Sequence, residues 1–231
     1  ENRLSKLVRK MSFWKTERIQ WRFQYLCLDT SCWVVTKRMT ETKPLTDYIQ
    51  QYIALSDEET SFLTSKIHLK KYRKGDALLH QGDICKTHYF ILSGATKTFY
   101  LDKAGAEHIL TFCIENWWAA DLGSLISQTP AAYNIQCLEN TSMLEIPLDA
   151  MENLYLKIPK LERFFRKIVE RAYVATQNRI RGTVSLSAKE QYTAFQKRYP
   201  QLEQRIPQYM VASYLGIQPQ SLSRIRKEIE A

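Results

Sequence analysis

Residues 206–229 read IPQYMVASYLGIQPQSLSRIRKEI, and this stretch decides what the C-terminal part of the chain can be. Ala212 gives a first short helix a small side chain where a second helix can cross it closely, and Gly216, four residues later, permits the tight turn between them. Pro219 suits the first turn of the second helix, because its missing N–H has no helical partner there. The stretch therefore predicts a helix-turn-helix, locked together by the apolar positions Val211, Leu215, Ile217, Leu222 and Ile225.

In such a motif the second helix places its N-terminal side chains against base edges in the major groove. Arg224 can form two hydrogen bonds with guanine, and Gln220 can do the same with adenine. Serine, arginine and lysine further along suit phosphates, which add affinity without sequence information. The alternative is an ordinary helical hairpin with a solvated basic face. The predicted DNA-binding residues are Gln220, Ser221, Ser223, Arg224, Arg226 and Lys227.

Charge is divided unevenly along the chain, which carries a net charge of +9. Residues 39–149 hold 9 Lys and Arg against 14 Asp and Glu, whereas residues 150–182 hold 8 against 3 and residues 183–231 hold 7 against 4. An acidic middle followed by a basic C-terminal part indicates a protein in two parts, of which the second meets a polyanion. A merely solvated basic surface is the alternative, and charge alone does not decide between them.

The middle of the chain has a period of two, which is typical of half-buried strands. Short runs of this kind separated by Gly-Asp and Ser-Gly turns favour an all-β sandwich or roll. A helical pattern over residues 44–66 precedes it, with Leu45 and Ile49 on one face and Ser56 and Glu59 spaced as a capping box. The predicted strands are Ala77–His80, His88–Leu92, Ala95–Leu101, His108–Cys113, Tyr133–Leu138 and Ser142–Ile146.

A helix of about twenty residues is predicted from Pro159, which suits the first helical position, to Gly182 as a left-handed C-terminal cap. Its apolar residues are spaced by three and four, so they form one stripe that needs a partner. We expect a second copy of the chain as that partner, and packing on the chain's own β domain is the alternative. A further capping box, Ser187 with Glu190, starts the next helix. The predicted dimer-helix residues are Leu161, Phe165, Ile168, Ala172 and Ala175.

Other classes of function lack support in the sequence. No apolar run approaches the ~18 residues of a membrane span, and no signal segment opens the chain. The five scattered cysteines favour free, buried thiols in a reducing cytoplasm over a metal cluster. We find no phosphate-binding loop, nucleophile elbow or zinc-protease motif, so we expect no enzyme, no metal and no cofactor. Residues 1–38, which precede Met39-Thr-Glu-Thr-Lys-Pro, are predicted to be an extension, with a basic nucleic-acid-binding arm as the alternative.

The chain resembles the Crp/Fnr family of bacterial transcription regulators from about residue 45 to residue 231. The resemblance lies in the order of YRKGDALLHQGD (72–83), YFILSGATK (89–97), a long helix and VASYLGIQPQSLSRIR (211–226). It implies a cyclic-nucleotide-binding-like β-roll, a dimerising helix and a winged-helix DNA reader. It also implies double-stranded DNA as a partner, a homodimer, a cytoplasmic location and RNA polymerase as a candidate further partner.

Two departures from the family pattern matter. Members that bind cyclic nucleotides carry Gly-Glu-Leu, whose Glu takes the ribose hydroxyl, and about ten residues later an Arg that neutralises the phosphate. The matching positions here are Ala120-Asp121-Leu122 and Ala131-Ala132. Asp121 can still accept a hydroxyl, but Ala131 leaves a buried phosphate without a counter-charge, so we expect an effector other than cyclic AMP. The sequence also ends at Ala231 before a clear wing, so we expect Lys189, Lys197 or Arg198 to contact the DNA backbone.

The sequence therefore predicts an α+β protein. Its expected parts are the extension 1–38, a β-roll effector domain at 39–149, a dimerisation helix at 150–182 and a helix-turn-helix domain at 183–231. The expected function is that of a sequence-specific transcription regulator whose effector is unknown. The alternative is a small-molecule sensor that acts through protein contacts and carries a degenerate DNA-binding domain.

Overall fold

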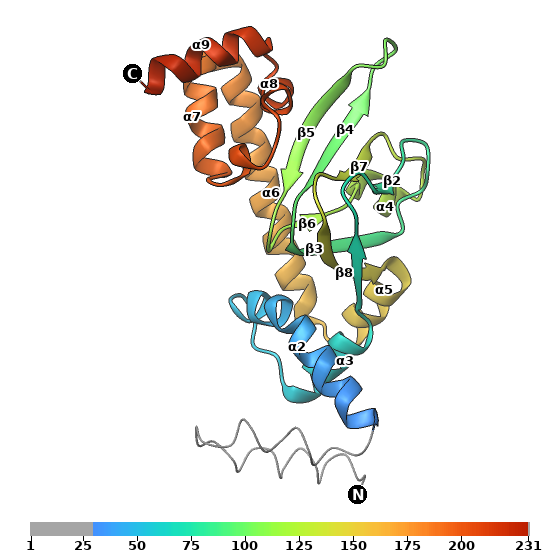
Figure 1. Ribbon diagram of the computed structural model, residues 1–231. Helices are drawn as coiled ribbons and strands as arrows, with labels where there is room; N and C mark the ends of the chain where they lie inside the picture. The colour runs from blue at the N-terminus through green and yellow to red at the C-terminus, as the bar shows by residue number, and fades with distance from the viewer. Residues whose placement is uncertain (1–29, 231) are drawn as a thin grey trace, which may run out of the picture. The chain divides into compact units, whose positions relative to one another are not determined.

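Two four-stranded antiparallel sheets make up the β-rich part of the chain (Figure 1). The computed structural model describes the backbone of residues 30–230 and the side chains of residues 40–229. One sheet has the strand order β1-β8-β3-β6 and the other β2-β7-β4-β5. The strands are β1 His68–Tyr72, β2 Ala77–Leu79, β3 Thr87–Ser93, β4 Thr96–Leu101, β5 Glu107–Cys113, β6 Trp118–Ala119, β7 Asn134–Cys137 and β8 Thr141–Pro147.

All six predicted strands are present, and each boundary lies within two residues of its prediction. Strands β1 and β6 were not predicted individually. Strand β1 is an edge strand of mostly polar residues, and β6 has only two residues, so neither carries an apolar alternation of its own. Both sheets turn apolar side chains toward a shared core, where Ile91, Ile135 and Met143 are fully buried.

Helices precede, follow and connect the strands. They are α2 Thr30–Gln50, α3 Asp57–Ser65, α4 Leu122–Ser127, α5 Leu148–Lys157, α6 Lys160–Ser185, α7 Ala188–Arg198, α8 Gln208–Leu215 and α9 Pro219–Glu230, with a 3₁₀ turn at Leu202–Gln204. Both predicted capping boxes form, Ser56 with Glu59 and Ser187 with Glu190. Together these elements give the predicted α+β class.

The predicted end of the long helix at Gly182 is wrong. Helix α6 continues to Ser185, and the extended residue Leu186 caps it by donating its N–H to the Gly182 carbonyl. Gly182 is buried within the helix, and a Cβ there would meet Leu186 Cδ1 at 3.5 Å. The helix runs on because the stop signal is the Ser187 cap of the next helix, not the glycine.

The chain divides into two units, residues 1–41 and residues 42–231, and every contact described below lies within the second. Leu45 and Ile49 are buried there, as their helical spacing predicted. The predicted extension 1–38 lies almost wholly outside the described residues. Only the backbone of residues 30–38 is described, as part of α2, which continues through Met39.

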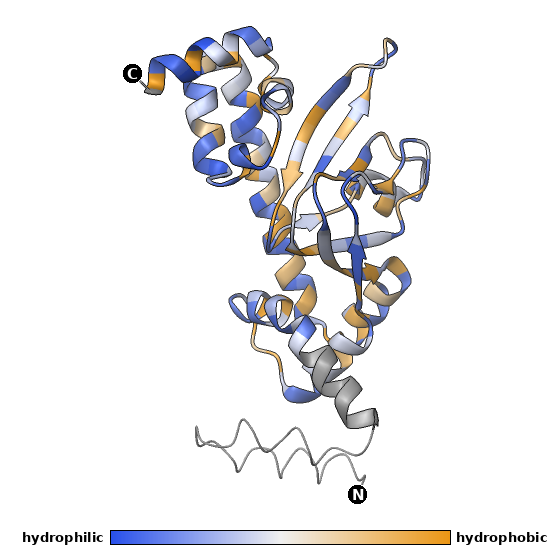
Figure 2. Ribbon diagram, viewed as in Figure 1, coloured by the Kyte–Doolittle hydropathy of each residue, from blue (hydrophilic) through white to orange (hydrophobic). Residues whose placement is uncertain are grey.

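Residues 188–230, here called the C-terminal helices, share one apolar core with the hairpin β4–β5. Tyr192, Tyr199 and Leu222 from these helices pack with Phe99 and Phe112 from the hairpin. Hydrophilic and hydrophobic residues alternate along α9 (Figure 2), and their spacing gives this helix one face for the core and one for solvent. A separate core joins α2, α3, α5 and α6 to the other sheet.

Candidate nucleic-acid interface

The helix-turn-helix forms as the sequence predicted. Helix α8 ends at Gly216, which adopts a left-handed conformation with φ +68° and donates its N–H back into the last turn. Ala212 is 1% exposed where the two helices meet. Four of the five predicted locking residues are buried, and the fifth, Ile217, is partly buried against the same core. Because these contacts hold α8 against α9, the outer face of α9 has a fixed orientation.

The outer face of α9 gathers four of the six predicted DNA-binding side chains. Gln220, Ser223, Arg224 and Lys227 are exposed, and their spacing of three and four places them on one side of the helix. Neither Arg224 nor Lys227 has a carboxylate partner among the residues whose side chains are described. A basic, unneutralised helix face of this kind suits contact with a nucleic acid.

The other two predicted residues, Ser221 and Arg226, are half-buried. Arg226 forms an ion pair with Glu203, with 3.3 Å between Nε and Oε1, so part of its charge is used within the C-terminal helices.

The basic residues that were expected to contact the DNA backbone differ from one another in their exposure to solvent. Lys189 and Lys197 are exposed, whereas the Arg198 guanidinium lies over the Trp117 ring, 5.1 Å from its centroid. Arg198 therefore faces the protein and not the solvent.

The C-terminal helices cap the open edge of strand β5. Ile109 donates its N–H to Ser213 Oγ at 3.1 Å, and Ser213 Oγ donates to the Glu107 carbonyl at 2.9 Å. Arg179 on α6 donates to the carbonyls of Leu110 and Ile109, and to that of Tyr214 on α8 at 3.0 Å. The edge of the sheet is thus paired by side chains from α8 and α6, which ties the position of α8 to the β-roll.

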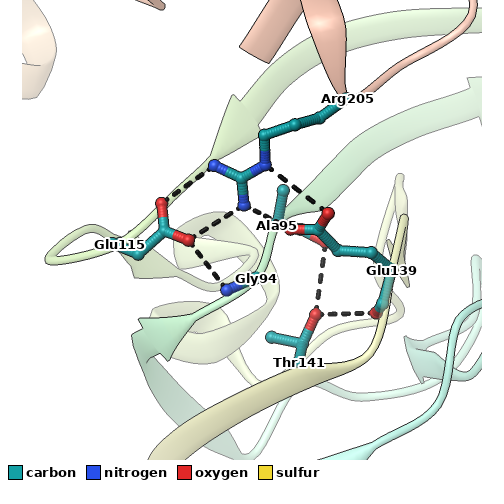
Figure 3. Close-up of polar contacts among 6 residues, drawn as sticks. All are labelled: Gly94, Ala95, Glu115, Glu139, Thr141 and Arg205. Atoms are coloured by element: carbon teal, nitrogen blue, oxygen red, sulfur yellow. Dashed lines mark hydrogen bonds and ion pairs between the residues drawn. The ribbon is translucent and has the colours of Figure 1, made fainter. Parts of the chain in front are cut away.

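A charged clamp holds the loop before α8 against three turns of the β-roll (Figure 3). Arg205 bonds both oxygens of Glu115, at 3.1 and 2.9 Å, and also pairs with Glu139. Glu115 accepts a further bond from the Gly94 N–H. Gly94 has φ +100°, and a Cβ there would lie 2.5 Å from Thr141 Oγ1, so only glycine fits between these turns. Because the Arg205 guanidinium bonds both oxygens of Glu115, it fixes the angle as well as the distance between the loop before α8 and the β-roll.

We expect Arg205→Met to lower the free energy of unfolding at pH 7 by about 1–2 kcal/mol. Breaking a fully buried pair costs about 3–5 kcal/mol. The loss is smaller here because the three side chains are 24%, 36% and 33% exposed and are partly screened by solvent. Urea unfolding at low and high salt measures the difference, which should shrink as the salt concentration rises.

The loss of stability caused by Arg205→Met should also disappear in acid. Burial alone would raise the pKa of Glu115, but hydrogen bonds from Arg205 and from the backbone hold that pKa below its ordinary value of 4.5. A lowered carboxyl pKa adds stability above the ordinary pKa, and this stability is lost as the pH falls through the lowered value. The gap between wild type and Arg205→Met should therefore close at pH values below the lowered pKa. A gap that is independent of both salt and pH would contradict an electrostatic clamp.

The stretch that matches the family's cyclic-nucleotide pocket is closed by its own hydrogen bonds. Asp121 is 6% exposed and caps α4, with Oδ1 accepting the Ser124 N–H at 3.1 Å. Its Oδ2 accepts the Ala132 N–H at 3.2 Å. Ala131 is 4% exposed and brings no cation, as the sequence indicated. The other two predicted pocket residues border α4, where Ala120 is half-buried and Leu122 is 40% exposed.

The first three residues of the predicted dimer stripe on α6 pack on the chain's own core. Leu161 is fully buried in the core under α5 and α6, and Phe165 and Ile168 pack against the same core, so Leu161 has no surface for a partner. Ala172 is exposed and Ala175 is half-buried. Three- and four-residue spacing marks an apolar face but does not say what covers it. The stripe that α6 leaves exposed lies one residue further on, about 100° around the helix, and comprises Val169, Tyr173, Ile180 and Val184.

Sequence reasoning missed Arg179, Arg205 and Ser213, which join the C-terminal helices to the β-roll. Each is a single polar residue whose partners lie far away along the chain, so no local pattern marks it. The predicted buried thiols are confirmed for Cys85, Cys113 and Cys137, whereas Cys27 and Cys32 lie outside the described side chains. The described residues contain no group of three or more His, Cys, Asp or Glu side chains placed to hold a metal ion.

Comparisons with known proteins agree with this architecture. Residues 69–157 match the family model described as "Cyclic nucleotide-binding domain". The transcriptional activator protein Anr of Pseudomonas protegens is 28% identical over 166 residues, 66% of this chain and 66% of that protein. The fumarate and nitrate reduction regulatory protein of Yersinia pestis is 28% identical over 185 residues, 74% of this chain and 72% of that protein. These matches support a transcription regulator of the Crp/Fnr type.

Two solved structures of bacterial proteins have the same fold. FixK2 from Bradyrhizobium japonicum superposes with a TM-score of 0.63 at 14% identity, covering 71% of this chain and 84% of that one. The regulator CLP of Xanthomonas campestris gives 0.59 at 13% identity, covering 76% and 92%. Such low identities establish the fold alone. Within the described part of the chain, no helix is long and apolar enough to cross a membrane.

Proposed function

We propose that this protein binds double-stranded DNA at specific sequences and regulates transcription from them. The outer face of α9 carries this proposal. Arg224 and Gln220 are exposed there, four residues apart on a helix whose other side is locked against α8. The residue types fit guanine and adenine edges in the major groove. Ser223 and Lys227 on the same face, together with Lys189 and Lys197, are the proposed phosphate contacts.

We propose further that the protein acts as a homodimer through the exposed stripe on α6. Val169, Tyr173 and Ile180 are 48%, 63% and 58% exposed, an unusual exposure for large apolar side chains. Together with Thr176 they follow the alternating four- and three-residue spacing of a coiled-coil seam. A second copy of the chain is the proposed occupant, because a two-fold dimer presents two α9 helices to two half-sites. Contact with RNA polymerase remains a general expectation for the family.

Cyclic AMP is not the proposed effector. Both carboxylate oxygens of Asp121 already accept backbone hydrogen bonds, so a ribose hydroxyl would have to displace one of them. Ala131 offers no positive charge where the family places arginine. A cyclic phosphate in this stretch would be desolvated without a counter-ion, which costs several kcal/mol.

The proposal is tested by selecting binding sites from random duplex DNA with the full chain at near-physiological salt. We expect a near-palindrome whose half-sites lie about one helical turn apart. Adding cyclic AMP should leave the selected sequence and its affinity unchanged. Binding without any sequence preference would instead support a sensor that acts through protein contacts.

Arg224→Ala should weaken binding to the selected site by about 5- to 150-fold, the equivalent of about 1–3 kcal/mol, and relax preference at one base pair in each half-site. Lys197→Ala is the matched control, because loss of a phosphate contact should weaken all sequences alike. Fluorescence anisotropy on the selected and on scrambled duplexes separates the two patterns. If Arg224→Ala lost affinity equally for both duplexes, Arg224 would not be a residue that reads a base.

A further inference from the structure

A cavity of about 230 Å³ lies where α6, α7 and α8 meet. It is separate from the Asp121 stretch that the family uses for cyclic nucleotides. Its walls include Ala175, Gly182, Phe195 and Tyr214. An apolar cavity of about 150 Å³ accepts benzene, so this one has room for roughly nine non-hydrogen atoms. The space therefore suits a small molecule with a single ring.

Two arginines, Arg179 and Arg198, also line this cavity. Neither has a carboxylate within 4 Å among the described side chains, which distinguishes them from Arg205. Arg179 donates to three neutral backbone carbonyls. Arg198 donates its Nε–H to Tyr199 Oη and stacks on Trp117. Two half-buried positive charges without a counter-ion favour an anion in the same space.

The donors of Arg198 indicate which anion fits. Its Nη1 and Nη2 groups have no hydrogen-bond partner among the described residues. A guanidinium presents these two groups as a planar fork that matches the two oxygens of a carboxylate. The Phe195 and Tyr214 rings pack on each other, with centroids 5.4 Å apart, so the apolar wall left for a ring attached to that carboxylate is formed by Ala175, Leu186 and Ala194.

We propose that this cavity is the effector site of the protein and that it binds a small aromatic monocarboxylate, with the carboxylate on Arg198 and the ring against the apolar wall formed by Ala175, Leu186 and Ala194. The regulatory part of this proposal rests on the proposed DNA-binding function, whereas the binding part does not. The ligand contacts α6 on one side and α7 and α8 on the other. Its binding therefore stabilises one position of the C-terminal helices relative to the long helix.

Benzoate is the probe, and benzamide is its matched neutral control, because the two molecules have the same size and shape. Calorimetric titration of the full chain without DNA should give benzoate a dissociation constant on the order of 0.1–1 mM. Benzamide should bind about tenfold more weakly, since it lacks the charge-assisted bonds to Arg198. Saturating benzoate should also raise the melting temperature of the protein.

Two variants separate a site from non-specific binding. Ala175→Leu fills the cavity and should abolish benzoate binding, whereas Ala172→Leu, an exposed position on the same helix, should leave binding unchanged. Arg198→Gln should bind benzoate and benzamide about equally. The proposal is overturned if wild type fails to bind benzoate, if benzamide binds as well as benzoate, or if Ala175→Leu binds like Ala172→Leu.

The regulatory part has its own readout. Benzoate should change the affinity of the wild-type protein for its selected DNA site, and Ala175→Leu should remove that change. If the protein binds no specific DNA, the calorimetric result still stands, so failure of the proposed function and failure of the ligand site are distinguishable. Benzoate that binds but leaves DNA affinity unchanged would overturn the effector role.

Discussion

Replacing Phe112 by alanine should lower the free energy of unfolding by about 3–5 kcal/mol and release the C-terminal helices from the β-roll. Phe112 is fully buried on β5. Its ring packs against Phe195, Tyr199 and Tyr214, with centroids 6.3, 5.7 and 5.6 Å away. Truncation to alanine removes the contacts that join the β4–β5 hairpin to the C-terminal helices. It also leaves a cavity between them, which makes it one of the most costly kinds of core substitution.

Phe90→Ala is the matched control for this prediction. Phe90 is equally buried, but it lies on β3 in the core under α2 and α6, away from the C-terminal helices. Both variants should lose similar stability in urea. Only Phe112→Ala should also lose native-state hydrogen-exchange protection at the Ile109 amide, which donates to Ser213 Oγ across the junction. Equal protection of that amide in both variants would show that the junction does not depend on Phe112.

The polar contacts at the junction act differently from the packing of Phe112. Ser213 and Arg179 satisfy backbone groups on the edge of β5, and water can replace them when the C-terminal helices move away. The Arg205 clamp depends on salt and pH. The aromatic core thus supplies most of the attachment energy, whereas the polar contacts fix the angle at which α8 and α9 are held.

Local chemistry explains what the sequence could predict. Gly216, Ala212 and Pro219 act within a few residues of one another, so their spacing alone predicts the turn and the crossing of α8 and α9. Period-two patterns located six strands for the same reason. The edge strand β1 was not located because its residues are mostly polar and give no apolar alternation. In each case the signal and the structure it produces lie close together in the chain.

Contacts distant in sequence explain what could not be predicted. Arg205 meets Glu115 and Glu139 across separations of 90 and 66 residues, and Ser213 meets Glu107 across 106. Leu161 shows the corresponding limit for apolar residues. Its spacing correctly marked a buried face of α6, but whether a second copy or the chain's own sheet covers that face is a property of the tertiary fold.

Ile180→Glu should weaken the proposed dimer by at least about 100-fold. Ile180 is 58% exposed in the single chain, so the substitution should change the stability of the monomer by no more than about 0.5 kcal/mol. In a two-fold seam the change occurs twice, once from each copy, and both carboxylates lose water on association. Sedimentation velocity over a range of protein concentrations measures the dissociation constant.

Val174→Glu tests whether position on the helix matters, and not only the added charge. Val174 is 56% exposed on the same helix, but it lies about 100° or more around it from Val169 and Ile180. It should therefore leave the dimer intact, as should the apolar substitution Ile180→Leu. Equal weakening by both glutamates would place the interface elsewhere. Ile180→Glu, unlike Val174→Glu, should also bind the full palindrome more weakly. Its affinity for a single half-site should be unchanged, because α9 itself is unchanged and only the pairing of two copies is lost.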